Sequence, residues 1–308
     1  MFLKQRKIPI ELEVYNYLKA RTNFSEDENN YYGNLAKGFL GEVQLDEWLQ
    51  EGSINLLILC DLLFEVNHTT FQIDSLGISQ NKIYLFEIKN YEGDFCVEGD
   101  RWNTLSHIEI KNPVLQLKRS ESLLRQLLKD IGVMLPIESC IIFMNPEFHL
   151  YNSSRELPII FPSQLNRFKK KLHSLPPVPS TSHQIAQKIV SHHMKKSRFT
   201  RLPAYQFDQL RKGIVCCNCG SIATRLVHKN ALGCDDCQSK EEVDAAVLRS
   251  VQEFRLLFPE RMITTTDIYE WCKVIESKKC IRRILSSHFQ LIGKGKASSY
   301  IERVQTEE

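Results

Sequence analysis

Residues 70–90 read TFQIDSLGISQNKIYLFEIKN. The runs Thr70–Ile78 and Lys82–Lys89 are rich in β-branched and aromatic residues, and Ser79-Gln80-Asn81 between them is typical of a turn. This pattern predicts two antiparallel strands joined by a hairpin, and a sheet that forms the centre of the N-terminal half of the chain.

Two acidic residues of this hairpin are candidates for metal binding. Asp74 lies in the first strand, and Glu87 lies near the end of the second. Antiparallel pairing would bring both carboxylates near one hard cation, and Mg²⁺ prefers carboxylate, water and phosphate oxygens. Lys89 shares a face with Glu87, so its ammonium is expected to orient an attacking water or to offset transition-state charge. The alternative is a surface strand that ends in a Glu and a Lys, but the hydrophobic run before Glu87 favours a buried strand.

A helix is predicted upstream of the hairpin, from about Asn34 to Gln50, because apolar residues recur on one helical face. Gly38 and Gly41 lower helix stability, so their presence favours close approach of another backbone and places Glu42 near the edge of the sheet. The alternative is that Glu42 is an ordinary solvent-exposed residue. Further along the chain we expect a strand at Leu62–Val66, a helix at about Val114–Asp130 and a strand at Ile137–Met144, which together indicate a mixed α/β domain.

These motifs occur in the order of a known family. Gly38-x-x-Gly41-Glu42, Gln72-Ile73-Asp74, Glu87-Ile88-Lys89-Asn90 and Asn112-Pro113 with Gln116 resemble the nuclease-related domain (NERD) of the PD-(D/E)xK superfamily, over about residues 31–145. The superfamily's proline is absent, because Gln72 and Ile73 precede Asp74. The resemblance implies a restriction-endonuclease-like mixed sheet with flanking helices. It also implies a Mg²⁺ or Mn²⁺ site of Glu42, Asp74 and Glu87, with Lys89 as a catalytic residue and Gln116 in support from the later helix.

The composition is that of a globular protein with more than one domain. The 308 residues exceed the roughly 150 that one domain usually contains, and 43% hydrophobic with 25% charged residues argues against disorder. We expect neither a signal peptide nor a membrane helix. Ten cysteines without an export signal indicate the reducing cytoplasm, where clustered cysteines more often bind metal than form disulfides.

The expected domain organisation has five parts. A proline- and serine-rich stretch at 174–182 supports neither a helix nor a central strand, and it suggests a linker. We expect a helical extension at 1–30, the nuclease domain at 31–173, a linker with the basic cluster Lys195, Lys196, Arg198 and Arg201 at 174–204, a zinc ribbon at 205–240 and a basic helical module at 241–308.

Four cysteines have the spacing of a zinc ribbon. Cys216 and Cys219 form one C-x-x-C pair and Cys234 and Cys237 form another, separated by a segment long enough for one hairpin. Four sulfurs leave no open position for a substrate, so this Zn²⁺ would be structural. A redox dithiol or a disulfide is the alternative for these cysteines. Cys217 is a spare thiol that could replace one of the four ligands.

The C-terminal segment has the element order of a winged helix. We expect a helix at about Glu241–Phe258, a short helix capped near Thr264, a helix from Ser277 to about His288 and a β-hairpin over Phe289–Val304. Residues 278–304 hold seven basic residues against one acidic residue, which would attract a polyanion. The alternative is a small helical cap with a solvated basic face. The candidate nucleic-acid-binding residues are Lys278, Lys279, Arg282 and Arg283.

Two functions fit this sequence. The first is a divalent-metal nuclease that hydrolyses phosphodiester bonds in DNA, with RNA less favoured, and that engages nucleic acid through its C-terminal modules. The second is a nucleic-acid-binding or adaptor protein whose nuclease fold is inactive. The joint presence of Glu42, Asp74, Glu87 and Lys89 favours the first.

Overall fold

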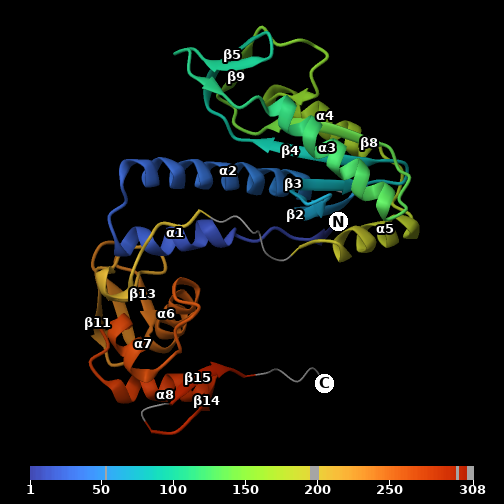
Figure 1. Ribbon diagram of the computed structural model, residues 1–308. Coiled ribbons are helices and arrows are strands. Elements are labelled where there is room, and N and C mark those ends of the chain that lie inside the picture. The colour runs from blue at the N-terminus through green and yellow to red at the C-terminus, as the bar shows by residue number, and fades with distance from the viewer. Residues whose placement is uncertain (53, 195–200, 296–297, 304–308) are drawn as a thin grey trace. The chain divides into compact units, whose positions relative to one another are not determined.

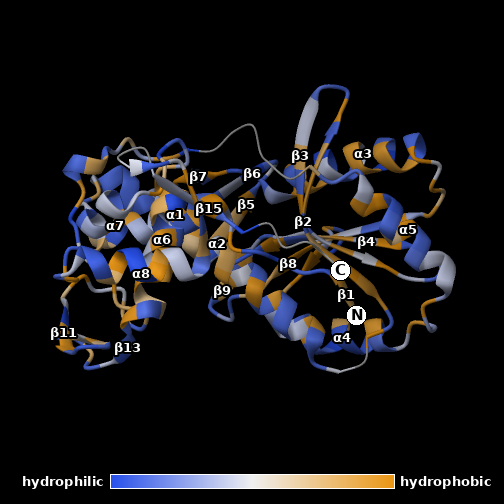
Figure 2. Cartoon of the chain, turned by 90° about the horizontal axis from the view of Figure 1, so that it is seen from below, coloured by the Kyte–Doolittle hydropathy of each residue, from blue (hydrophilic) through white to orange (hydrophobic). Residues whose placement is uncertain are grey.

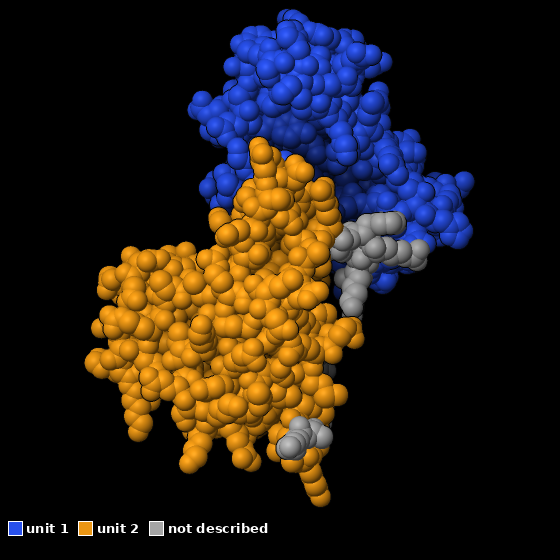
Figure 3. Space-filling model, turned by 60° about the vertical axis from the view of Figure 1, so that its left-hand side comes forward, with its two compact units in different colours: residues 1–8, 33–200 blue, residues 9–32, 201–308 orange. Residues whose placement is uncertain are grey.

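The chain folds into two compact units (Figure 3). The computed structural model describes residues 1–52, 54–194, 201–295 and 298–303. Unit 1 comprises Met1–Ile8 and Gly33–Thr200, and unit 2 comprises Pro9–Tyr32 and Arg201–Glu308. The segment expected as a helical extension therefore contributes to both units. No helix formed by the described residues has the length and the apolar character needed to cross a bilayer.

Unit 1 is built on a mixed sheet with the strand order β1-β2-β3-β4-β8-β10 (Figure 1). The neighbours β2, β3 and β4 are antiparallel, whereas β1 runs parallel to β2, and β8 runs parallel to both β4 and β10. The strands are β1 (Phe2–Lys4), β2 (Leu57–Val66), β3 (Thr69–Ile78), β4 (Ile83–Lys89), β8 (Ile137–Phe143) and β10 (Ile159–Ile160).

The predicted hairpin is β3–β4. Its ladder runs from Ser75 opposite Phe86 to Ile78 opposite Ile83. The turn is closed by the Ser79 amide, which donates to the Lys82 carbonyl at 3.0 Å. β2 begins at Leu57, five residues before the predicted start, because the run LILC at its beginning is buried on both faces. Such a two-sided core strand shows no alternation for a sequence pattern to detect.

Helices cover both faces of this sheet, which confirms the predicted mixed α/β class. On one face, α2 (Glu26–Gln50) and α4 (Leu165–His173) share a core cluster with β2, β4 and β8. On the other face, α3 (Pro113–Asp130) and α5 (Ser180–Ser191) pack in a larger cluster. The strands between these helices are mostly hydrophobic, as the orange colouring of Figure 2 shows.

A second sheet in unit 1 was not predicted from the sequence. This sheet has the strand order β7-β6-β5-β9. It is connected to the main sheet by a linker of three residues between β4 and β5. Its strands are β5 (Gly93–Glu98), β6 (Arg101–Thr104), β7 (Glu109–Ile110) and β9 (Phe148–Tyr151), and the short 3-10 turn η1 (Pro162–Gln164) precedes α4.

Two helices of the structure differ from the sequence-based expectation: α2 begins earlier than expected, and α5 begins within the expected linker. α2 starts at Glu26 rather than Asn34, because Ser25 and Glu28 form a reciprocal cap in which each side chain accepts the backbone N–H of the other. α5 begins at Ser180, directly after the prolines of the expected linker. Its Ala186 and Ile189 are fully buried in the core of unit 1, so packing of one apolar face stabilises this helix.

Unit 2 combines an N-terminal helix with the C-terminal third of the chain. The helix α1 (Ile10–Arg21) contributes Val14 and Leu18 to a core that it shares with α6 and the later helices. The other elements are the 3-10 turn η2 (Phe207–Gln209), the antiparallel sheet of β11 (Thr224–His228), β12 (Ala231–Cys234) and β13 (Lys240–Glu242), the helices α6 (Val243–Leu257), α7 (Thr265–Cys272) and α8 (Lys278–His288), and the hairpin of β14 (Phe289–Ile292) and β15 (Ser299–Glu302).

A buried ion pair fixes α1 within unit 2. The Arg21 guanidinium donates to both carboxylate oxygens of Glu253, at 2.6 and 2.7 Å, and its carbon Cζ lies 3.8 Å from the centre of the Trp271 ring. Arg21 and Glu253 are both inaccessible to solvent. Paired charges at this depth are tolerated because the guanidinium also donates to the carbonyls of Arg211 and Gly213, at 2.7 and 3.0 Å.

The C-terminal elements follow the order expected for a winged helix. Thr264 caps α7 by accepting the Asp267 amide at 3.1 Å, as predicted, whereas the Ser277 side chain makes no capping bond to α8. The hairpin β14–β15 pairs Phe289 with Glu302 and Ile292 with Ser299. Four basic residues of the expected clusters, together with the last residue of the expected hairpin, lie outside the described residues: Lys195, Lys196, Arg198, Lys296 and Val304.

Candidate functional site

The structure places all five predicted nuclease residues in unit 1, around the middle of β3 and the end of β4. Asp74 lies on β3, Glu87 and Lys89 lie on β4, Glu42 lies on α2, and Gln116 lies in the first turns of α3. The β3–β4 ladder ends at Ser75 and Phe86, one residue before Asp74 and Glu87 would pair. The two acids are therefore neighbours at the point where the strands separate.

The Glu87 carboxylate accepts hydrogen bonds from two side chains of the site. It is only 3% exposed, and its Oε1 accepts the Lys89 ammonium at 2.7 Å and the Gln116 amide at 2.5 Å. The Lys89 ammonium also donates to the Gln116 Oε1 at 3.2 Å. These three side chains form a closed triangle of hydrogen bonds, so Gln116 fixes the geometry of both charged groups.

The Asp74 carboxylate is fixed by a hydrogen bond from the backbone of the neighbouring strand. Its Oδ2 accepts the Ile88 amide at 2.9 Å, which replaces the ladder bond lost where the strands separate. Asp61 on β2, the residue opposite Asp74, has a left-handed φ of 52°, a conformation that aspartate tolerates better than most residues. The local distortion of β2 and β3 therefore coincides with the position of the acid.

Glu42 is bound by Arg6, which no sequence motif marks. The Arg6 guanidinium donates to the Glu42 Oε2 at 2.5 Å and to both carboxylate oxygens of Asp46, at 2.8 and 3.2 Å. It also donates to the Asp74 carbonyl at 2.9 Å. No local pattern in the sequence marks Arg6, because its partners lie 36 to 68 residues later in the chain.

The electrostatics of the site are those of crowded acids. Burial and repulsion by Asp74 raise the pKa of Glu87 to about 7, although Lys89 and Gln116 oppose the shift. Burial and Asp74 also raise the pKa of Glu42 to about 8, against the opposing charge of Arg6. Burial likewise raises the pKa of Asp74, despite the charge of Lys89 and the hydrogen bond from Ile88. A cation placed among these groups would relieve their repulsion.

Lys89 keeps its proton in this environment. Burial lowers the pKa of its ammonium, but the carboxylates of Glu87 and Asp74 together outweigh burial, so the pKa is raised. The side chain is 15% exposed. Lys89 is therefore a fixed positive charge that can stabilise an anion, and it is unsuited to act as a general base at neutral pH.

One of the two helix glycines allows a close approach to β4. A Cβ added at Gly41 would lie 2.6 Å from the Asn90 Cβ, whereas a Cβ at Gly38 would meet nothing within 4 Å. The Asn90 amide donates to the Lys37 carbonyl at 2.9 Å, which ties the end of β4 to α2. The predicted close approach is thus confirmed at Gly41 and wrong at Gly38.

Comparison with known proteins assigns this part of the chain. A family model described as the nuclease-related domain matches residues 37–144. Residues 37–144 form a nuclease-related domain. Among solved structures, the crystal structure of protein VC1899 from Vibrio cholerae is similar, with 13% sequence identity and a TM-score of 0.26. The similarity covers 53% of this chain and 50% of that chain, so the chain spans about half the length of that protein. The comparison with curated proteins gave no match.

The nuclease-related domain match contains Glu42, Asp74, Glu87, Lys89 and Gln116, but it excludes the N-terminal residues that carry Arg6. The three carboxylates do not bring their oxygens within 4.8 Å of one another; among the described residues only the cysteines of unit 2 gather to that extent. A divalent ion among these acids would therefore take part of its coordination shell from water and from a phosphate oxygen, as Mg²⁺ usually does.

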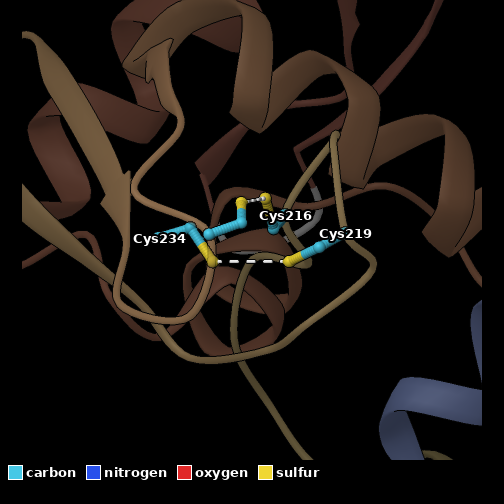
Figure 4. Close-up of side chains that lie close together, drawn as sticks. Cys216, Cys219 and Cys234 are labelled. Carbon is cyan, nitrogen blue, oxygen red and sulfur yellow. Dashed lines mark hydrogen bonds between the residues drawn. The ribbon is translucent and has the colours of Figure 1, made fainter.

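The four cysteines of unit 2 converge as a zinc ribbon requires (Figure 4). Cys216 and Cys237 have their sulfurs 3.6 Å apart, and the sulfurs of Cys219 and Cys234 are also 3.6 Å apart. Tetrahedral coordination with Zn–S bonds of about 2.3 Å places sulfurs about 3.8 Å apart, which agrees with this arrangement. Cys217, the spare thiol, is exposed and lies outside the cluster.

The backbone around the cysteines forms two tight turns. The Cys216 carbonyl accepts the Gly220 amide, and the Cys234 carbonyl accepts the Gln238 amide. Gly220 and Gln238 have left-handed φ values of 73° and 61°, so each turn reverses the chain directly after its C-x-x-C pair. The hairpin β11–β12 occupies the intervening segment, as the spacing predicted.

The basic residues of α8 lie on its exposed face but differ in how free they are. Arg283 forms a two-pronged ion pair with Asp244, at 2.7 and 2.9 Å. The Lys278 ammonium lies 5.2 Å from the centre of the Tyr269 ring. Lys279 and Arg282 are exposed and make no ion pair with any described residue. These two residues are therefore the freest cations of the helix.

A shallow cavity of about 440 Å³ adjoins the start of α8. Three lysines contribute to its lining, so a negatively charged group would be attracted there. The residues that line it are Lys212, Thr266, Tyr269, Glu270, Lys273 and Lys278.

Proposed function

We propose that this chain is a divalent-metal-dependent nuclease that hydrolyses phosphodiester bonds, with DNA as the favoured substrate. The observation that carries the proposal is the clustering of Glu42, Asp74 and Glu87 beside the ammonium of Lys89 within a nuclease-related domain. The ionised forms of crowded, buried acids cost stability, and binding of a divalent cation would offset their repulsion.

The residues have distinct roles in this proposal. Asp74 and Glu87 provide carboxylate oxygens for Mg²⁺ or Mn²⁺, and Glu42 provides another, either directly or through water. A metal bound there would polarise the scissile phosphate and activate a water molecule. In the reaction, a water oxygen forms a bond to phosphorus and the bond to the leaving sugar oxygen breaks, which yields a phosphate monoester and an alcohol.

Lys89 and Gln116 act on charge and geometry. The Lys89 ammonium stabilises the negative charge that builds up on the phosphate oxygens, and its raised pKa keeps it protonated for this role. Gln116 bonds to both Lys89 and Glu87, so it maintains the distance between the metal-binding acid and the ammonium. This division makes Lys89 and Gln116 dispensable for metal binding, unlike Asp74 and Glu87.

Unit 2 would engage the nucleic acid and hold a structural Zn²⁺. The four-cysteine cluster fits a zinc ribbon. The exposed Lys279 and Arg282, together with the lysine-lined cavity, support contacts with the phosphate backbone. We also propose a location in the reducing cytoplasm, because clustered cysteines such as these four more often bind metal there than form disulfides.

Cleavage assays test this proposal. The full-length chain is incubated with single- and double-stranded DNA and RNA in Mg²⁺, Mn²⁺ or EDTA, alongside the isosteric variants Asp74→Asn and Glu87→Gln. Glu47→Gln is the matched control, because Glu47 is an exposed glutamate on α2. We expect metal-dependent cleavage that the two site variants abolish and the control retains.

Two results would count against the nuclease. Full activity in folded Asp74→Asn and Glu87→Gln proteins would remove these acids from the reaction. Absence of cleavage on every substrate by the unmodified chain, combined with retained DNA binding, would favour the adaptor function instead.

A further inference from the structure

The first eight residues, which we call the N-terminal segment, extend the sheet of unit 1. β1 pairs in parallel with β2, and the Met1 amino group donates to the Leu56 carbonyl at 2.8 Å. The Lys4 ammonium donates to the carbonyls of Cys60 and Asp61, each at 2.6 Å. These contacts fix the segment along β2 and bring the next residues to the acids of the site. The segment lies outside the nuclease-related match.

Arg6 connects three parts of the site through one guanidinium. Its side chain is 4% exposed, and its donors bond to Glu42, to both oxygens of Asp46 and to the Asp74 carbonyl. Glu42 and Asp46 are four positions apart on α2 and therefore share a helical face. Two adjacent carboxylates beside Asp74 would turn away from each other unless a cation lay between them.

The fork of the guanidinium suits this role. Five N–H donors in a rigid plane can bond to two carboxylates and a carbonyl at once, which a lysine ammonium cannot reproduce in the same geometry. Among the described residues, the hydrogen bonds to Glu42 involve only its Oε2. The Oε1 of Glu42 thus remains available for a metal ion while the carboxylate is held in place.

We propose that Arg6 is a positioning residue of the nuclease site, which orients Glu42 beside Asp74 for metal binding, and that the N-terminal segment is therefore part of that site. This inference rests on the proposed function, because it assigns a role relative to the metal. The ion pair with Asp46 fixes the guanidinium against α2. The hydrogen bond from the same guanidinium then holds the Glu42 carboxylate in one orientation.

Metal binding provides a direct test. Isothermal titration of Mn²⁺ into the full-length chain at fixed pH compares the unmodified protein with Arg6→Lys, which keeps the charge but loses the fork. Loss of a residue that orients a metal ligand typically weakens metal affinity by about 10- to 100-fold, and we expect a decrease in this range. Lys7→Gln is the matched control, because Lys7 is the adjacent exposed cation. The Mn²⁺ affinity of this variant should equal that of the unmodified protein.

A double-mutant cycle separates positioning from general stability. If Arg6 acts through Glu42, then Arg6→Lys should cause little further loss of Mn²⁺ affinity in a Glu42→Gln background. An equal additional loss in that background would overturn the proposal, as would unchanged affinity in Arg6→Lys alone. A chain that binds no Mn²⁺ even when unmodified would instead refute the metal site of the proposed function.

A measurement on the unmodified protein covers the case in which Arg6→Lys does not fold. In a sample labelled with ¹⁵N-arginine, Mg²⁺ should shift the guanidinium resonances of Arg6, and that of Nη1 most, because the metal would draw charge from the Glu42 carboxylate that Nη1 binds. The resonances of exposed arginines serve as the internal reference. An Arg6 signal that stays in place while Mg²⁺ saturates the protein would overturn the proposal.

Discussion

Metal affinity should rise steeply with pH, because the candidate ligands must lose their protons before they bind a cation. The pKa of Glu87 is about 7 in the metal-free site. Its ionised fraction is then about one in eleven at pH 6 and about ten in eleven at pH 8, so apparent Mg²⁺ affinity should increase about tenfold between these pH values. If Glu42, whose pKa is raised to about 8, must also ionise, the increase should be steeper than tenfold.

Calorimetric titration of Mg²⁺ into the full-length chain at pH 6, 7 and 8 measures this dependence. Glu42→Gln should make this increase shallower, because one titrating ligand is removed. Glu47→Gln, on the exposed face of α2, should leave it unchanged. An affinity that is constant or falls between pH 6 and 8 would refute the reasoning that these acids bind the metal.

The same pKa values determine how the metal-free fold responds to pH. Glu42 and Glu87 have pKa values in the folded protein above the ordinary glutamate value, so the folded state binds protons more tightly than the unfolded state. Their contribution to stability is fully present below the unfolded pKa and is lost as pH rises through about 7 to 8. Thermal unfolding with EDTA should therefore show a falling melting temperature over this range, and added Mg²⁺ should reverse the loss.

Three further predictions concern Lys89, the zinc ribbon and the basic helix α8. Lys89→Met should reduce the cleavage rate by about a hundredfold or more while Mg²⁺ affinity persists, since an electrostatic contact to the transition state is lost; single-turnover kinetics with saturating metal would show this, and an unchanged rate would exclude the role. The purified protein should contain one Zn²⁺ per chain, and elemental analysis that finds none in a folded sample would contradict the ribbon. Replacement of the four basic residues of α8 by Gln should weaken the salt dependence of DNA binding. The log-log slope should fall by up to about three units rather than four, because Arg283 is already paired with Asp244. An unchanged slope would indicate that α8 is a structural cap.

The sequence was sufficient to predict the centre of the fold. The β-branched and aromatic residues of the two runs and the turn residues around Ser79 predicted the β3–β4 hairpin, and the two-residue period correctly placed Glu87 and Lys89 on one face. The C-x-x-C spacing predicted the convergence of four sulfurs. These features are local, because each depends on residues that are close in sequence and on regular backbone geometry.

The features missed from the sequence depend on distant partners or on overlooked local signals. β1 has three residues and pairs with a strand more than 50 residues later, so no pattern within the N-terminal segment indicates it. Arg6 is an isolated cation whose role depends on that pairing. The start of α2 could have been found, because Ser25 and Glu28 have the spacing of a capping box. The prolines before α5 favoured the prediction of a linker. The helix forms there because its apolar face, which includes the buried Ala186, packs in the core.

The division of the first 32 residues between the two units has a consequence for synthesis on the ribosome. The N-terminal segment can pair with β2 once Leu59 is made, whereas the partner of Arg21, Glu253, is 232 residues further along the chain than Arg21. At about 5 to 20 residues per second, α1 emerges roughly 12 to 46 seconds before Glu253 is made. During that interval the apolar face formed by Val14 and Leu18 has no native core to join. The nascent chain therefore exposes this apolar face until α6 is made, and a protein truncated before α6 would retain the exposed surface permanently.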